Sequence, residues 1–332
     1  MDGVLVIDKP VGLTSHDVVA RARRILRERR VGHTGTLDPA ATGVLPLVIG
    51  RATRLARFLS ASDKTYDAVV VLGMASDTGD ATGTPIGSPH QGPLPSRDAI
   101  DHALDEFRGT FMQKPPVYSA KKIDGKRSYA LARLTRATDK GSDPLGDRGV
   151  ALRPVAVTVE HLAIISVDGA RVTLQVECSA GFYVRSLAHD LGDRLGVGAH
   201  LGALRRTRSG DYTLEEAMTL EAAERDPADA VRRIIPLARM LSSMPKIVLT
   251  PEGVRRAGHG RDLGDADVLR IADCGLRIES GLGNESAIQS ALRNPRSAIP
   301  RFVRLVDPNG ELVGIAEPAG AGGLLHPSVV LV

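Results

Sequence analysis

Two alternating β runs around a tight turn constrain the fold of this chain most. The stretch "AVTVEHLAIISVDGARVTLQVEC", residues 156–178, alternates apolar and polar residues on either side of Asp168-Gly169. An Asp-Gly pair between two such runs is typical of a β-hairpin. The pattern therefore predicts that antiparallel pairing dominates at least one sheet of the protein.

Segments with helical patterns surround this hairpin. Residues 13–30 have one apolar face, and Thr14 followed by Asp17 three positions later resembles a capping box. A second amphipathic segment begins after Ser96, its expected N-cap, and ends at Gly109. Other patterns fit strands at residues 3–10 and 65–74, a strand leading into a helix at 181–196, and a helix at 213–226. This mixture predicts an α+β fold.

The composition and the pattern of the sequence change near Ser243, beyond which glycine is frequent and short β-like runs dominate. A length of 332 residues is also typical of about two domains. We therefore predict a main domain over residues 1–242 and a small β-rich domain over residues 243–332. Within the second domain, residues 274–300 lack clean periodicity and are expected to form an irregular segment.

Composition excludes several classes of protein. The two cysteines, Cys178 and Cys274, lie far apart, which argues against a disulfide framework or a common zinc motif. No signal peptide and no apolar stretch long enough to cross a membrane is visible, so we expect a cytoplasmic protein without a membrane partner. Arginines crowd residues 21–30 and 205–208, and the pI is about 9.2. Such basic runs next to glycine-rich loops favour a polyanionic partner over merely solvated helix faces.

A single carboxylate, Asp38, stands in the glycine-rich stretch "VGHTGTLDPAATGVLPLVIG", residues 31–50. Asp38 followed by Pro39 fits the start of a short helix or a turn that Asp38 caps. It also fits a rigidly held nucleophile or base that needs a nearby cation to stay ionised. No second acid lies close in sequence for a glycosidase pair, and no P-loop, HExxH or GxSxG pattern is present. No metal site is therefore expected.

Five sequence blocks resemble the TruB-type tRNA pseudouridine-55 synthases. They are "DKPVGLTSHDVV", "GHTGTLDPAATGVLPLVIGRATR", "SDKTYDAVVVLGMASDTGDATG", "KPPVYSAKKIDGKRSYALAR" and "CSAGFYVRSLAHDLGDRLGVGAHLGALRRTRSG", in family order across residues 3–220. The tail "RFVRLVDPNGELVGIAEP" resembles part of a PUA domain, a small RNA-binding β module.

The resemblance implies a central mixed, mostly antiparallel sheet with flanking helices and an RNA-gripping insertion at about residues 123–152. It also implies isomerisation of uridine 55 in the T loop of tRNA to pseudouridine, without cofactor or metal. The base would be flipped out of the RNA before it reacts. The expected partner is the T stem-loop of tRNA, and we expect a monomer.

The resemblance also assigns roles to single residues. Asp38 would be the catalytic carboxylate, Arg185 its ion-pair partner, and Tyr66 the ring that stacks on the target base and takes a proton in a late step. The remaining substrate-binding residues would be Tyr183, Leu204, His33, Lys9 and Pro10. We expect phosphate contacts from Lys64, Lys121, Lys122, Lys126, Arg205 and Arg206, and also from Lys9. Each role has a plainer alternative: Tyr66 as a core aromatic, His33 as a surface residue, Arg185 as a phosphate contact and the cations as solubilising charges.

Two rival functions stay open at the level of the sequence. One is a guide-RNA-dependent pseudouridine synthase, which would share the PUA tail. The other is a catalytically silent protein that binds tRNA or helps it fold. The basic insertion favours a stand-alone enzyme, and the intact set of expected catalytic residues argues against a silent binder.

Overall fold

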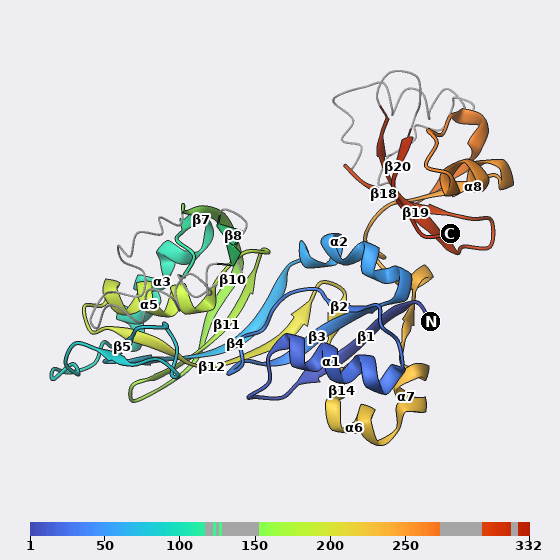
Figure 1. Ribbon diagram of the computed structural model, residues 1–332. Helices are drawn as coiled ribbons and strands as arrows, with labels where there is room; N and C mark the ends of the chain where they lie inside the picture. Colours follow the sequence, from blue (N-terminus) through green and yellow to red (C-terminus); the bar gives the residue numbers. More distant parts are fainter. Residues whose placement is uncertain (117–121, 124–125, 128–152, 273–300, 320–324) are drawn as a thin grey trace.

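A computed structural model describes residues 1–116, 122–123, 126–127, 153–272, 301–319 and 325–332 (Figure 1). All but three residues of the predicted insertion at 123–152 lie outside the described residues, as do Lys121 and the segment 274–300. Within the described part, no helix is long and apolar enough to cross a membrane.

An 11-stranded mixed sheet forms the main domain. Its strands follow the order β14 (Met218–Thr219), β1 (Gly3–Lys9), β3 (Thr42–Ile49), β12 (Ala199–Ser209), β4 (Lys64–Leu72), β11 (Arg171–Cys178), β10 (Val155–Asp168) and β7 (Gly109–Gln113), with β2 (Val31–His33), β13 (Tyr212–Thr213) and β15 (Ile235–Pro236) attached to β3, β12 and β1. Only the β1–β14 and β3–β12 pairs are parallel. The predicted α+β class, with a mixed and mostly antiparallel sheet, is confirmed.

Helices and short strands complete the main domain. The helices are α1 (Ser15–Leu26), α2 (Ala56–Ser60), α3 (Arg97–Leu104), α5 (Val184–Arg194), α6 (Leu220–Arg225) and α7 (Pro227–Arg232), with 3-10 turns η1 (Gly50–Leu55), η2 (Asp105–Phe107) and η3 (Leu237–Arg239). Two small hairpins pair β5 (Ala75–Ser76) with β6 (Pro85–Ile86) and β8 (Lys122–Ile123) with β9 (Lys126–Arg127).

The two faces of the sheet are covered by different elements, because successive side chains of a strand point to opposite faces. On β1, Leu5 and Ile7 pack in the same core as Val18 of α1 and Leu187 of α5. Val4 and its alternate neighbours face the other way, toward η1, α2 and the second domain. Figure 1 shows α1 and α5 over different halves of the sheet, which leaves the middle strands between them.

Local sequence signals determine several element boundaries. The hairpin forms as predicted, with Asp168 opposite Arg171 and a positive φ at Gly169 that a residue with a side chain adopts less easily. The capping box forms too, since Thr14 and Asp17 exchange hydrogen bonds of 2.9 and 3.1 Å at the start of α1. These signals are strong because each is satisfied by residues close in sequence.

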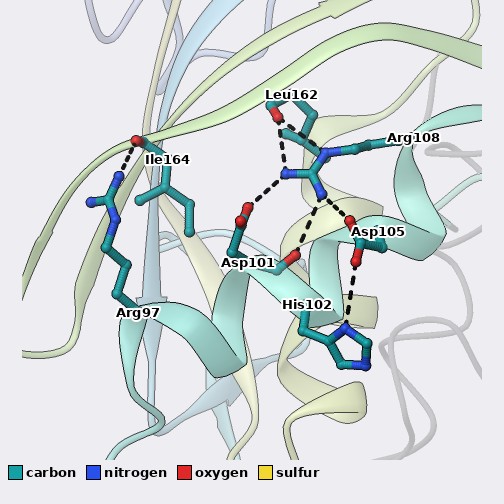
Figure 2. A network of polar contacts seen from close by, with 7 residues as sticks. All are labelled: Arg97, Asp101, His102, Asp105, Arg108, Leu162 and Ile164. Atoms are coloured by element: carbon teal, nitrogen blue, oxygen red, sulfur yellow. Dashed lines mark hydrogen bonds and ion pairs between the residues drawn. The ribbon is translucent and has the colours of Figure 1, made fainter.

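Arginines attach α3 to the long strand β10 (Figure 2). Arg97 donates a 2.7 Å hydrogen bond to the carbonyl of Ile164. Arg108 donates to the carbonyl of Leu162 and pairs with Asp101 at 2.6 Å. The helix is thereby held against the outer strands by side chains that bond to backbone carbonyls, as well as by its apolar face.

The structure decides one open alternative and corrects one predicted helix. Of the two alternatives at Asp38-Pro39, the turn forms and the helix does not, and the apolar run after it becomes the buried strand β3. Its apolar residues are buried on both faces, so the run lacks helical periodicity. Of the predicted helix at 213–226, only α6 is helical, because the preceding residues form β13 and β14.

A second, five-stranded sheet follows residue 245. Its order is β17 (Val268–Ala272), β16 (Lys246–Leu249), β18 (Val303–Val306), β19 (Leu312–Pro318) and β20 (Leu325–Val330), accompanied by α8 (Pro251–Gly258) and η4 (Asp265–Asp267). Val248 and Ile315 of this sheet share one apolar cluster with Val4 and Val48 of the main sheet. The described parts of the two domains are thus joined by a common core.

Arg304 of β18 binds the chain that connects the domains. It is 7% exposed, and its guanidinium donates to the carbonyls of Met244 at 2.9 Å and Ser242 at 3.2 Å. We expect Arg304→Met to lower the free energy of unfolding by about 1–3 kcal/mol, because these carbonyls would lose their donor. Thermal and urea unfolding would measure the loss.

Arg255 on α8 offers a matched control, since its side chain is 74% exposed and pairs only with a neighbouring glutamate on the same helix. Arg255→Met should change the stability by about 0.5 kcal/mol or less. An equal loss of unfolding free energy in Arg304→Met and Arg255→Met would contradict a stabilising role of the Arg304 hydrogen bonds to the connecting chain.

Candidate active site

The loop between β2 and β3 carries Asp38 and is fixed from behind by two polar side chains. Lys9, at the end of β1, donates hydrogen bonds to the carbonyls of Ala41 at 2.7 Å and Pro39 at 3.4 Å. Ser15, in the first turn of α1, bonds both the N–H and the carbonyl of Leu37. Each backbone neighbour of Asp38 is therefore held by a buried group, which restricts where its carboxylate can point.

Arg185 forms an ion pair with Asp38. Its Nε lies 2.9 Å from Oδ2 of Asp38, and its terminal nitrogen donates to the carbonyl of Thr78 at 3.0 Å. The arginine side chain is 7% exposed, whereas that of Asp38 is 41% exposed. The carboxylate thus keeps access to solvent and substrate while its counter-ion is locked in the protein.

The N-terminus of α5, which carries Arg185, is fixed by the side chain of Gln113. Tyr183 is the N-terminal cap residue, and its backbone N–H and carbonyl both bond the side-chain amide of Gln113, at 2.8 and 3.1 Å. Gln113 ends β7 and is 2% exposed. Two distant parts of the chain, the Asp38 loop and the start of α5, therefore meet with little freedom.

A cavity of about 230 Å³ opens beside this ion pair. Its walls come from the Asp38 loop, α2, β4, the turn before α5, and β12. The lining residues are Gly35, Thr36, Leu37, Asp38, Ser60, Lys64, Tyr66, Ser179, Gly181, Phe182, Tyr183, Val184, Arg185, Leu204 and Arg206. The cavity thus brings together Asp38, Tyr66, Tyr183, Arg185 and Leu204, which lie far apart in the sequence.

Tyr66 contributes an aromatic ring to this cavity. Its residue is 9% exposed and lies directly opposite Arg206 on the neighbouring strand. Burial raises the pKa of the Tyr66 hydroxyl, and the charge of Arg206 opposes that rise. The ring offers an apolar face for a planar group, and its hydroxyl interacts with a cation.

Three of the expected phosphate contacts are buried instead. Lys9 is 0%, Arg206 1% and Lys64 6% exposed. Each bonds backbone carbonyls: Arg206 those of Val44 and Gly35, and Lys64 those of Ser60 and Ser62. The structure thus gives all three side chains backbone partners, while their phosphate contacts, and the substrate contact of Lys9, stay predictions. A basic run suggests a solvated face, but β12 turns alternate residues inward.

Burial also changes the acidity of the two lysines. It lowers the pKa of Lys9 to about 8, although the charge of Asp38 opposes the shift. Burial, followed by the positive charge of Arg206, lowers the pKa of Lys64 to about 8 as well. Near neutral pH both ammonium groups therefore remain mostly charged.

The other predicted contacts lie outside the cavity. His33 ends β2 and packs edge-to-face against His16, with ring centroids 5.3 Å apart. Pro10 is half-buried behind the loop and contributes its carbonyl to Lys9. Arg205 stays accessible and pairs with Asp8 at 2.8 Å. Lys122 and Lys126 belong to the β8–β9 hairpin, and Lys121 is not among the described residues.

Sequence reasoning missed several groups that build the site. Ser15 holds the loop that carries Asp38, Gln113 holds the start of α5, and the carbonyl of Thr78 accepts from Arg185. The cavity is also lined by Ser60 and Phe182. Ser15, Thr78 and Phe182 stood in blocks quoted for their family resemblance but received no role there, and a backbone carbonyl has no signal in a sequence. In the described part of the chain, no cluster of His, Cys, Asp or Glu side chains is suited to a metal ion.

Lys9→Met would test the cost of burying the Lys9 ammonium. The pKa of Lys9 is about 8 in the folded protein and ordinarily 10.5, so the unfolded chain binds more protons between these values. The free energy of unfolding of the wild type should therefore rise relative to Lys9→Met as the pH increases through this window, by about 1–3 kcal/mol. Urea unfolding of both proteins below pH 8 and near pH 10.5 measures the change; a flat or falling difference would contradict it.

Family models match most of the main domain. The model "TruB family pseudouridylate synthase (N terminal domain)" matches residues 23–184, and "tRNA pseudouridylate synthase B C-terminal domain" matches residues 185–247. A tRNA pseudouridine synthase B of Solibacter usitatus is 41% identical, with both chains covered completely. One of Burkholderia mallei is 37% identical over 100% of this chain and 97% of its own length.

Solved structures agree with this assignment. A Cbf5-Nop10-Gar1 complex matches with a TM-score of 0.70 at 27% identity, over 99% of this chain and 85% of that one. The archaeal box H/ACA sRNP Nop10-Cbf5 complex gives 0.69 at 26%, over 99% and 86%. The main domain has the pseudouridine synthase fold. On the full-length identity to relatives and the matching family models, the chain belongs to the TruB family of pseudouridylate synthases.

Proposed function

We propose that this protein isomerises uridine 55 in the T loop of tRNA to pseudouridine, with Asp38 as the essential carboxylate. The observation that carries the proposal is the ion pair of Asp38 with buried Arg185 at the edge of a cavity that also contains Tyr66. The names of the relatives, tRNA pseudouridine synthase B, support tRNA as the substrate.

The reaction cuts the N-glycosidic bond, turns the uracil and joins its C5 to C1′ of the ribose. A stacked base is inaccessible to a side chain, so the uridine must first leave the RNA stack, which costs a few kcal/mol. The Tyr66 ring offsets part of this cost by stacking on the base, which contributes about 1–3 kcal/mol. Leu204 and Tyr183 supply the other contacts within the cavity.

The exposure of the two paired groups suits a carboxylate that must touch the substrate. Asp38 reaches the cavity, and Arg185 holds its charge from the protein side at 2.9 Å. Three roles fit Asp38: attack at C6 of the uracil, attack at C1′ of the ribose, or removal of the 2′ proton. All three need the ionised oxygen.

RNA outside the cavity meets other parts of the chain. His33 ends β2 just before the Asp38 loop and accepts a hydrogen bond from the N–H of Gly35, which lines the cavity, so it is suited to fill the place that the flipped base leaves. Arg205 is accessible for a phosphate. We assign RNA gripping to the insertion at 123–152 with Lys121, Lys122 and Lys126, and further RNA binding to a PUA-like domain over 243–332. The T stem-loop of tRNA is the expected partner of a cytoplasmic, monomeric enzyme.

A guide-RNA-dependent enzyme is the second candidate, because the matched solved structures are of H/ACA ribonucleoproteins. The relatives named tRNA pseudouridine synthase B are more similar, at 37–41% identity against 25–27%. Modification of naked tRNA by the pure protein supports the stand-alone enzyme. Modification only after a guide RNA and further proteins are added would support the second candidate.

Asp38→Asn should abolish the release of tritium from tRNA that carries 5-tritiated uridine, while tRNA binding persists. Isomerisation expels the label at C5, and asparagine has the shape of the carboxylate but neither its charge nor its nucleophilicity. Asp67→Asn is a matched control, because Asp67 is exposed and follows Tyr66 on β4. It should release tritium like the wild type.

The other outcomes of this experiment are equally clear. Release by Asp38→Asn would mean that another group is the catalytic acid. Tight tRNA binding without release by the wild type would overturn the proposed reaction and favour a silent tRNA-binding protein.

Arg185→Ala should lower the rate of pseudouridine formation by at least about a hundredfold and also weaken the fold. It removes the buried partner that orients Asp38 and leaves the Thr78 carbonyl without this donor. Single-turnover kinetics and thermal unfolding would measure the two effects. Normal turnover in a folded Arg185→Ala protein would contradict the role of the ion pair.

A further inference from the structure

Arg206 lies on β12, the strand between β3 and β4 in the main sheet. On one side of β12 it pairs with Gly43 of β3 in the parallel direction. On the other side it lies directly opposite Tyr66 of β4 in the antiparallel direction. Residues opposite each other on adjacent strands project from the same face of a sheet. The side chains of Arg206 and Tyr66 therefore reach the same cavity, which both of them line.

The guanidinium of Arg206 joins three parts of the site. Its Nε donates to the carbonyl of Val44 at 2.7 Å, and a terminal nitrogen donates to the carbonyl of Gly35 at 3.1 Å. The same guanidinium lies beside the hydroxyl-bearing ring of Tyr66, which is opposite it on β4 and lines the same cavity. A planar fork of five donors can hold both carbonyls at once, whereas a lysine cannot reproduce this geometry.

Arg206 also acts on the charge that Tyr66 can carry. Asp38 and Cys178 raise the pKa of the Tyr66 hydroxyl, as burial does, and Arg206 is the group that lowers it. A buried phenol without a cation would hold its proton far above neutral pH. The arginine is 1% exposed, so solvent screens this interaction little.

We propose that Arg206 is a positioning residue for the isomerisation: it holds the Tyr66 hydroxyl in the cavity and supports the transfer of the uracil C5 proton to that oxygen. The inference rests on the proposed function. It assigns to Arg206 an action through Tyr66, in place of the phosphate contact expected from the basic run on β12.

The proton transfer balances as follows. After the new bond to C1′ forms, C5 carries both that bond and its original hydrogen. The Tyr66 oxygen takes this proton as its own hydroxyl proton passes to water, and the electron pair of the C5–H bond forms the C5=C6 bond. The displaced pair leaves either on N1, which takes a proton from water, or with the carboxylate of Asp38 if that group is bound at C6. Tyr66 thus ends the step as a phenol again.

A double-mutant cycle tests the proposal. Single-turnover rates of pseudouridine formation would be measured for the wild type, Tyr66→Phe, Arg206→Gln and the double variant. Arg206→Gln alone should lower the rate about a hundredfold or more, with tRNA binding nearly unchanged. If Arg206 acts through the Tyr66 hydroxyl, the double variant should be no slower than Tyr66→Phe within about threefold.

A double variant slowed by the product of the two single effects would overturn the proposal, since Arg206 would then act independently of the hydroxyl. If Tyr66→Phe falls below detection, tRNA with 5-deuterated uridine decides. A larger isotope effect in Arg206→Gln than in the wild type supports slowed loss of the C5 hydrogen, and an unchanged one overturns it. A wild type that forms no pseudouridine would overturn the proposed function itself.

Two further variants separate this action from general stability. Arg206→Lys keeps the charge without the fork, so it should recover part of the lost rate, and it replaces Arg206→Gln in the cycle if that variant does not fold. Arg97→Gln is the matched control, because Arg97 on α3 also donates to a backbone carbonyl, that of Ile164 (Figure 2), but does not line the cavity. It should form pseudouridine at the wild-type rate.

Discussion

Buried cations bonded to backbone carbonyls hold the site together. Lys9 binds the far side of the Asp38 loop, Arg206 joins that loop to β3, Lys64 binds the end of α2, and Arg185 binds Asp38 and the Thr78 carbonyl. A buried charge is tolerated only when its donors are satisfied, and loop carbonyls need donors in turn. The cations and the irregular loops therefore stabilise each other, and the loops become rigid without secondary structure of their own.

This arrangement explains why an acidic group can meet an anionic substrate. Three buried cations, Lys64, Arg185 and Arg206, line a cavity whose lining contains one carboxylate, that of Asp38, and buried Lys9 lies behind the loop that carries it. In a medium of low dielectric their field reaches further than it does in water. A phosphate that brings the base toward Asp38 thus approaches a region of net positive charge. The basic character of the sequence acts here from inside the protein as well as from its surface.

Local patterns predicted the parts of the fold that depend on neighbours in sequence. The hairpin at Asp168-Gly169 and the capping box of Thr14 are complete within a few residues. Asp38-Pro39 left a helix and a turn open, because the same dipeptide fits both, and the strand that follows the turn is decided by pairing with β1 and β12. The meeting of Asp38 with Arg185 was expected only through family resemblance, since 147 positions separate them and spacing carries no information about it.

The buried cations were the largest gap between sequence and structure, and the reason is physical. A lysine or arginine is rarely buried unless it is paired, so a basic run favours a surface. On β12, however, the arginines alternate: Arg205 points outward to Asp8, and Arg206 points inward to the loop and Tyr66. Successive side chains of a strand point to opposite faces, so neighbouring arginines have different surroundings. This difference can be predicted once the run is recognised as a strand. Adjacent arginines of one basic run thus have different surroundings: Arg205 stays accessible beside Asp8, and Arg206 binds the loop that carries Asp38 from inside the protein.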